Sequence, residues 1–147
     1  MNAIAPISEA EVNELATEWY RKLDVHAPMV EILPILADKE LEMVFPEATV
    51  HGYAGFEGWY QRVIRLFFDE VHTLKEVTLM PGEGAVEVKV VVQWEASVWN
   101  PPNAKSARIN CDAYQRWFVK RSPATAQPIV VKYIVDKLEY HEGSATL

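Results

Sequence analysis

The chain of 147 residues has one cysteine, no long apolar run and no concentration of positive charge. A single Cys111 cannot form an internal disulfide, and its place in an apolar strand pattern favours a small buried side chain over a nucleophile. No uninterrupted apolar run approaches the roughly 18 residues that a membrane span requires, so we expect no membrane-spanning segment. These absences leave an ordinary globular fold as the expectation.

The charge pattern argues against a nucleic-acid partner. The 21 acidic residues outnumber the 14 basic ones, and the basic residues are scattered rather than gathered in a patch. The N-terminus has neither a basic cluster nor a hydrophobic segment of signal-peptide length, so we expect a cytoplasmic location. The sequence has no Gly-rich phosphate loop, and its four histidines lack the spacing of metal ligands. We therefore expect no cofactor and no metal.

What the chain does have is enough apolar material for one core. Apolar residues make up 50% of the sequence and aromatic residues 11%. A chain of this length buries roughly two-thirds of its unfolded surface on folding. We see no repeat or linker, and expect a single domain over residues 1–147, with a frayed polar tail at about 141–147.

The first half of the sequence has the spacing of helices. Ser8 and Glu11 have the spacing of a capping box, and apolar residues then recur at helical intervals, which predicts a helix over 8–25. Pro28 suits the start of a second, short helix. A strand over 41–45, a loop over 47–55 and an aromatic-rich helix over 55–68 complete this half.

From His72 onward the apolar period changes to two. This predicts strands over 72–80, 85–99, 107–121 and 129–140. Helices followed by strands without alternation indicate an α+β fold with a mainly antiparallel sheet. Strands of about 14 residues would span roughly 45 Å if straight, so they must bend. A curved sheet wrapped around the N-terminal helices would enclose a cavity on its concave side, where a small molecule could bind.

This order of elements resembles the nuclear transport factor 2-like superfamily, which includes SnoaL-like polyketide cyclases, ketosteroid isomerases and scytalone-dehydratase-like enzymes. The segments that carry the resemblance are Trp19–Asp24, Phe45–Pro46, Gly52–Phe56 with Trp59–Tyr60, Phe67–His72 and Tyr133–Asp136. The resemblance implies a cone-shaped, cystatin-like α+β barrel with a deep pocket, and usually a homodimer. The superfamily hosts isomerases, dehydratases, cyclases, hydrolases and members without catalysis, so the resemblance does not select one function.

The scytalone-dehydratase-like members use a tyrosine and an aspartate at the end of the first helix and a histidine in the strand after helix 3. Tyr20, Asp24 and His72 stand at comparable places in this sequence. In a dehydration, such a histidine would remove a proton next to a carbonyl while a donor polarises that carbonyl. In the alternative, Tyr20 belongs to the core, Asp24 caps helix 2 and His72 only begins a strand.

Ketosteroid isomerases place an aspartate base in the loop before helix 3, where this chain has none. His51 could act as the base instead, and Tyr53 could donate a hydrogen bond to an enolate. In the alternative, these are an ordinary loop histidine and a tyrosine at the rim. Asp112 is the loose match to the buried acid of these isomerases, but strand parity places it on the outer face, paired with an arginine.

The aromatic residues favour a flat, mostly apolar ligand. The candidate lining residues are Phe45, Tyr53, Trp59, Trp94, Trp117 and Tyr133. Two interpretations of the cavity stay open: acid/base chemistry of the isomerase, cyclase or dehydratase type, or ligand binding without catalysis. Two or more titratable side chains converging on one cavity would favour the enzyme.

The predicted outer face of the sheet suggests a homodimer. It carries a mixture of polar and aromatic residues, which are Gln93, Glu95, Trp99, Tyr114, Arg116 and Phe118. Exposed aromatic side chains among hydrogen-bonding groups are typical of protein interfaces. We therefore expect two copies to pair through this face.

Overall fold

The computed structural model describes residues 5–81 and 84–147. The first half contains helix α1 (Glu9–Asp24), helix α2 (Met29–Ile32), a 3-10 turn (Leu33–Ile35), strands β1 (Glu42–Val44) and β2 (Thr49–His51), and helix α3 (Gly52–Leu66). The second half contains four long strands, which are β3 (Phe67–Met80), β4 (Val86–Val98), β5 (Ala107–Arg121) and β6 (Pro128–Tyr140). The predicted order of helices followed by sheet is confirmed.

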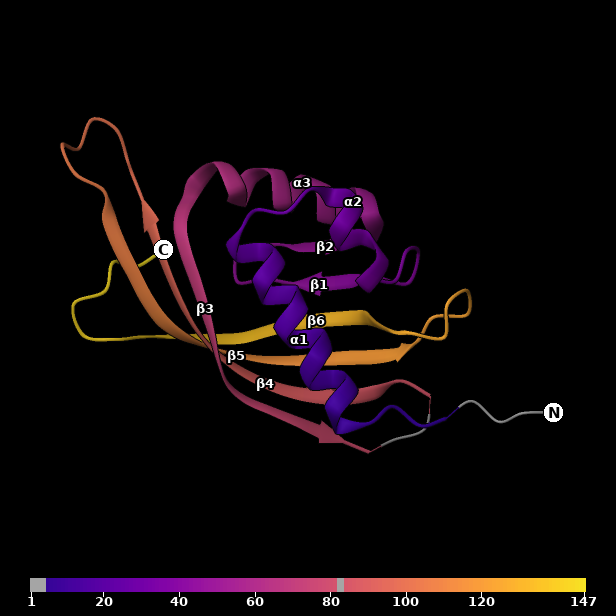
Figure 1. Ribbon diagram of the computed structural model, residues 1–147. Coiled ribbons are helices and arrows are strands. Elements are labelled where there is room, and N and C mark those ends of the chain that lie inside the picture. Colours follow the sequence, from indigo (N-terminus) through magenta and orange to yellow (C-terminus); the bar gives the residue numbers. More distant parts are fainter. Residues whose placement is uncertain (1–4, 82–83) are drawn as a thin grey trace.

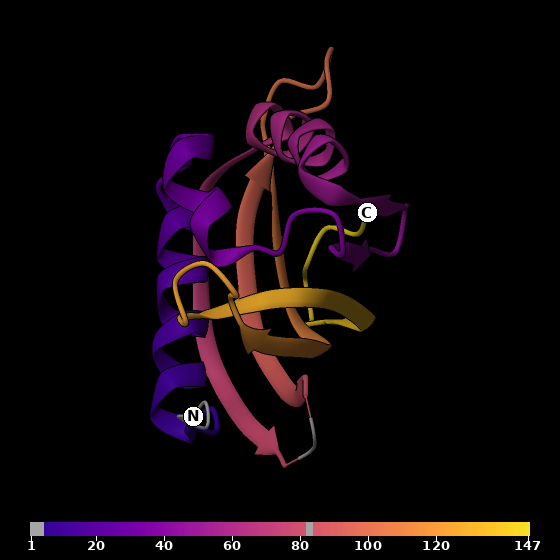
Figure 2. The same cartoon turned by 90° about the vertical axis from the view of Figure 1, so that its right-hand side faces the viewer.

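The strands form one six-stranded mixed sheet in the order β2-β1-β6-β5-β4-β3. All neighbouring pairs are antiparallel except β1 with β6, which run parallel. The long strands bend, and the helices lie within the curve of the sheet (Figures 1 and 2). The edges β2 and β3 are not paired with each other, so the expected barrel is an open curved sheet.

Helix α1 begins with the predicted capping box. The Glu11 backbone N–H donates to Ser8 Oγ at 3.1 Å, and the Ser8 N–H donates to Glu11 Oε1 at 3.0 Å. Arg121, the last residue of β5, also donates to both Glu11 carboxylate oxygens, at 2.8 and 2.9 Å. The apolar stripe of the helix is buried, from Val12 to Leu23. The cap therefore fixes both the start of α1 and its position on the sheet.

Two regions differ from the sequence prediction. Strand β3 begins at Phe67 rather than His72, since Phe67 and Phe68 already pair with β4. The sequence pattern does not show this start, because Asp69 has a left-handed φ of 50° and a register shift between Phe68 and Val71 interrupts the alternation. The expected loop over 47–55 contains strand β2, and α3 begins within it at Gly52, whose φ of 65° suits glycine. In the tail at 141–147, the Ala145 N–H donates to the carbonyl of Arg108 on β5 at 2.9 Å.

The core lies between α1, α3 and the concave face of the sheet. Its largest fully buried side chains include Trp19, Phe56, Tyr60 and Trp117. Cys111 is also buried, and burial together with the neighbouring Asp112 charge raises its pKa to about 11. A thiol held in its protonated form fits the predicted role as a small apolar side chain. None of the helices described is long and apolar enough to span a membrane.

The Glu11 contacts predict an acid-sensitive contribution to stability. Hydrogen bonds from Arg121 and the Ser8 backbone lower the pKa of Glu11 from 4.5 to about 2. A lowered pKa in the folded state stabilises the fold above pH 4.5, and this contribution is lost as the pH falls toward 2. Because the carboxylate is about one-third exposed, Glu11→Gln should lower the free energy of unfolding by only about 1–2 kcal/mol at pH 7.

Urea denaturation at pH 7 and again near pH 2.5 measures this difference. The gap between wild type and Glu11→Gln should narrow as the pH falls. Glu9→Gln, in the same first turn of α1, is the matched control and should change stability by less than about 0.5 kcal/mol. A gap that stays constant with pH would contradict the assignment to the Glu11 carboxylate.

Candidate active site

Asp24 and His72 form a hydrogen-bonded pair where the end of α1 meets β3. Asp24 Oδ1 lies 2.6 Å from His72 Nδ1, and Asp24 Oδ2 accepts the His72 backbone N–H at 3.1 Å. A carboxylate only accepts hydrogen bonds, so His72 Nδ1 carries the hydrogen, and in the neutral ring the lone pair is on Nε2. The His72 side chain is 9% exposed. Asp24 thus fixes both the orientation and the tautomer of the ring, instead of capping α2.

Tyr20 packs against the same histidine. Its ring stacks on the His72 ring with the centroids 4.7 Å apart, and its hydroxyl donates to Gln115 Oε1 at 2.7 Å. Burial, and then the nearby Tyr133 hydroxyl, raise the pKa of Tyr20 well above its usual value, so the phenol stays neutral. Tyr20 supports His72 from one side and does not itself line the cavity.

Gln115 on β5 is a buried polar side chain at the cavity wall. Its Oε1 accepts the Tyr20 hydroxyl and also the Trp117 indole N–H, at 2.9 Å. Two donors at one oxygen fix the orientation of the amide. The amide NH₂ is therefore the part of Gln115 that remains for a bound ligand.

A cavity of about 400 Å³ opens beside these residues. His72 and Gln115 line it together with four of the predicted aromatic residues, which are Phe45, Trp59, Trp94 and Tyr133. The Phe45 and Trp59 rings stack face to face with centroids 4.0 Å apart. The walls are mainly apolar, and the volume falls in the range of small-molecule sites.

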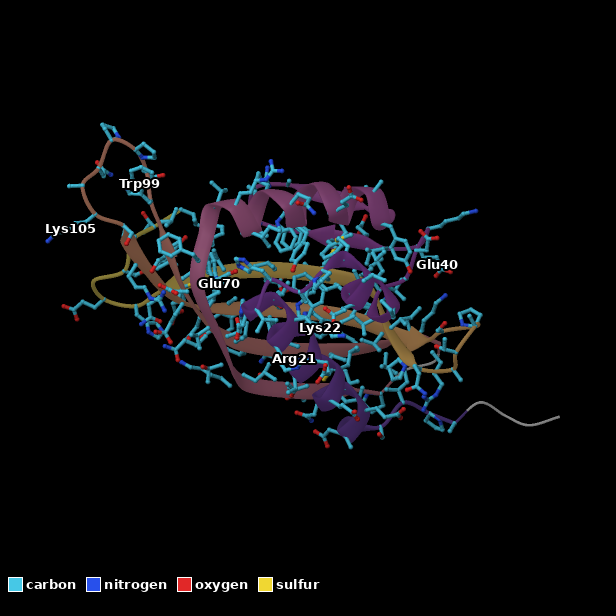
Figure 3. All side chains as sticks on the ribbon, turned by 45° about the horizontal axis from the view of Figure 1, so that its top comes forward. Arg21, Lys22, Glu40, Glu70, Trp99 and Lys105 are labelled. Atoms are coloured by element: carbon cyan, nitrogen blue, oxygen red, sulfur yellow. The ribbon has the colours of Figure 1, made fainter. Side chains whose placement is uncertain are left out.

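Glu70 also lines this cavity and is held from two sides. Its Oε1 accepts the Trp94 indole N–H at 3.1 Å, and its Oε2 lies 2.6 Å from His26 Nε2. The Glu70 side chain is 8% exposed, whereas His26 is 29% exposed and lies in a groove on the outside of the cavity wall. In Figure 3, Glu70 lies on β3, away from the projecting β4–β5 connection that carries Trp99 and Lys105.

Three of the predicted site residues lie elsewhere. The His51 side chain is 67% exposed and lies 4.0 Å from Glu42, and the Tyr53 hydroxyl donates to the backbone carbonyls of Leu33 and Leu36. Because α3 starts directly after His51, both side chains stay outside the cavity lining. Trp117 is buried behind the wall and acts through Gln115. The structure therefore brings His51 and Tyr53 to no common site with His72.

Asp112 lies on the outer face, as strand parity predicts. It is paired with Lys75 at 2.8 Å and His141 at 3.1 Å rather than with an arginine. Burial acts to raise its pKa, but the hydrogen bonds from Lys75 and His141 lower the pKa overall. Asp112 is therefore ionised and lies outside the cavity.

The sequence analysis missed Glu70, His26 and Gln115. Glu70 precedes His72 by two positions and lies on the same face of β3. The predicted strand begins at His72, so it does not include Glu70. Gln115 lies on the same buried face of β5 as Ala113 and Trp117. A polar residue in an otherwise apolar buried row indicates a candidate site residue, so the sequence pattern could have predicted Gln115. Nothing in the sequence pattern of the α1–α2 turn points to His26. In the described residues, no three His, Cys, Asp or Glu side chains gather as a metal site.

The cavity predicts binding of a neutral apolar fluorophore. N-phenyl-1-naphthylamine should bind with increased fluorescence, and Val135→Trp should weaken binding at least about 10-fold, because Val135 lines the cavity and the larger side chain would fill it. Val71→Trp is the matched control, since Val71 is 45% exposed and outside the lining. Circular dichroism would check the fold of both variants, and equal binding by both would place the fluorophore elsewhere.

Comparison with protein families gives no matching family model, and comparison with curated proteins gives no match. Comparison with solved structures gives many matches with low sequence identity. A hexachlorocyclohexane dehydrochlorinase (LinA-type3) from Novosphingobium barchaimii superposes with a TM-score of 0.72 at 15% identity, covering 94% of this chain and 92% of the other.

Two further structures describe the fold in general terms. A nuclear transport factor 2-like superfamily protein from Salmonella enterica has a TM-score of 0.69 at 14% identity, covering 94% of this chain and 92% of the other. A protein of unknown function with a cystatin-like fold from Nostoc punctiforme has a TM-score of 0.71 at 12% identity, covering 99% and 100%. The chain thus has the α+β fold of the nuclear transport factor 2-like superfamily.

Proposed function

We propose that this protein binds a small, mostly apolar or aromatic molecule in its cavity and removes a proton from it, as a cofactor-independent lyase of the dehydratase type. The observation that carries the proposal is the Asp24–His72 pair, whose histidine faces an apolar cavity while its carboxylate lies behind it. A histidine oriented by a carboxylate is a common arrangement for a general base.

The chemistry begins with the imidazole of His72. Nε2 takes a proton from the carbon next to a carbonyl, and Asp24 stabilises the imidazolium that forms, because Nδ1 already donates to its carboxylate. The electron pair of the broken C–H bond forms a double bond as the group on the next carbon leaves with its own electron pair. The imidazolium then loses its proton to the departing group or to water.

Negative charge that develops on the carbonyl oxygen needs a donor. The amide NH₂ of Gln115 is suited to this role, because Tyr20 and Trp117 hold the opposite end of the amide. The Tyr133 hydroxyl lies 3.4 Å from the Tyr20 hydroxyl and lines the same cavity. Burial raises the pKa of Tyr133, so its hydroxyl stays neutral. Because Tyr20 donates to Gln115, Tyr133 is the donor in its contact with Tyr20 and would turn from Tyr20 to donate to a ligand.

The structural neighbours support elimination chemistry by analogy. One is named as a hexachlorocyclohexane dehydrochlorinase, an activity that removes a proton and a leaving group from adjacent carbons. At 15% identity this likeness concerns the fold, so the argument for this chain depends on its own residues. The competing proposal is a protein that uses the same cavity for binding alone.

Substitution of the histidines tests the proposal. With bicyclic β-hydroxy ketones as a substrate panel, His72→Ala should lower turnover by about 100-fold or more, because the general base is lost. Asp24→Asn should produce a smaller loss than His72→Ala. His51→Ala is the matched control and should leave turnover unchanged, since His51 is exposed and outside the cavity. Formation of the conjugated product would be followed by absorbance.

Two other outcomes would reject the lyase. Turnover that survives His72→Ala would remove the proposed base. Ligands that bind tightly to wild type without any turnover would favour the non-catalytic binding protein instead.

We also propose that two copies pair through the outer face of the sheet. Tyr114 and Phe118 lie there, each with a lysine near its ring: Lys137 lies 4.6 Å from the Tyr114 centroid and Lys132 lies 5.9 Å from that of Phe118. Light scattering should report a dimer at micromolar concentration, and Tyr114→Glu should shift it toward monomer. A wild-type monomer under these conditions would contradict the proposal.

A further inference from the structure

Among the described residues, Glu70 is one of two acidic side chains that line the cavity, and it precedes the proposed base by two positions on β3. It lines the cavity, yet only 8% of its side chain is exposed, so it has left bulk water. A carboxylate in such surroundings stays ionised only when donors compensate for the lost hydration. The Trp94 indole and the His26 ring supply two donors, one to each oxygen.

The backbone around this contact departs from regular structure on both sides. His26 has a left-handed φ of 50°, directly after the C-terminal residues of α1, at a place where glycine is the usual residue. Asp69 also has a φ of 50° and lies with Glu70 in the register shift between Phe68 and Val71. Non-glycine residues in this conformation are destabilising by about 1 kcal/mol or more each, and such residues cluster at functional sites.

The donors leave part of the carboxylate unused. A carboxylate has about four acceptor positions, and the described residues donate to two of them. Glu70 lines the cavity as well as the outer groove beside His26, so a molecule bound in the cavity lies next to this side chain. The remaining positions accept hydrogen bonds only, so the matching group on the ligand must be a donor.

We propose that Glu70 determines the specificity of the cavity by selecting a neutral ligand that bears a hydroxyl group, such as a phenol or an alcohol. A ligand carboxylate would face a like charge. A ligand ammonium would lose its hydration among apolar walls beside a carboxylate that His26 already compensates. A hydroxyl satisfies the acceptor at the smallest desolvation cost.

This inference depends on the proposed ligand-binding role of the cavity, but not on turnover. The probes are 2-naphthol, 2-methoxynaphthalene and 2-naphthoate, which share one ring system and differ in the polar group. Their displacement of N-phenyl-1-naphthylamine gives three dissociation constants. Wild type should bind 2-naphthol about 10-fold or more tighter than either of the others, as expected for a hydrogen bond to a charged acceptor.

Glu70→Gln should remove most of this preference, because the amide is uncharged and carries donors of its own. Glu70→Leu should reverse the order of 2-naphthol and 2-methoxynaphthalene. Glu47→Gln is the matched control and should keep the wild-type preference, since Glu47 also lines the cavity but is held by Trp59 and Arg62.

Three results would overturn the proposal. These are equal binding of 2-naphthol and 2-methoxynaphthalene by wild type, a preference that survives in both Glu70 variants, and no binding of any of the three probes. Failure of the lyase proposal would look different, because turnover would be absent or independent of His72 while the hydroxyl preference remained.

Discussion

The two hydrogen bonds that His72 donates to Asp24 are the contacts on which this arrangement depends. One carboxylate holds both the backbone N–H and the ring of His72, so the end of α1 is fixed to β3 at a single point. The capping box and Arg121 hold the other end of α1 against the end of β5. With both ends fixed, the helix lies along the concave face of the sheet and leaves the cavity beside its C-terminus. The His72 contact is thus both a structural joint and the proposed source of the chemistry.

The sequence was sufficient to predict most of the fold, because the fold depends on periodicity. The apolar stripe of α1 and the alternation from Val86 to Val92 are unambiguous, and both are buried as expected. The missed features involve too few residues for a period to appear. Strand β2 has three residues, and the start of β3 is interrupted at Asp69. Periodicity predicts the curved sheet, but whether such a sheet closes depends on whether its two edge strands meet, and here β2 and β3 do not pair.

The candidate site was predictable only in part for the same reason. Helix spacing places Tyr20 and Asp24 on one face, and the structure brings them to His72 through contacts across 48 positions or more. Predicting that Gln115 and Glu70 face the cavity depends instead on the alternation of side chains along their strands. Both lie at register shifts, where a displacement of one residue would place the side chain on the other face of the sheet. His51 has a residue type that suits a base, but the sequence does not determine where its side chain lies. In the structure His51 is exposed and outside the cavity lining.

Two histidine–carboxylate pairs cross at the junction of α1 and β3. In one pair, Asp24 at the end of α1 contacts His72 on β3. In the other, His26 in the turn after α1 contacts Glu70 on β3. The strand residues line the cavity and the residues on the helix side do not, so one pair presents an imidazole to a ligand and the other a carboxylate. Both groups accept protons or hydrogen bonds, which leaves Gln115 and Tyr133 to supply donors. A ligand that would use all four of these groups under the two proposals offers a removable proton and a donor on one side and an acceptor on the other. A hydroxylated carbonyl compound has all three, whereas a hydrocarbon or a halide lacks the donor, and this division follows from which member of each pair reaches the cavity.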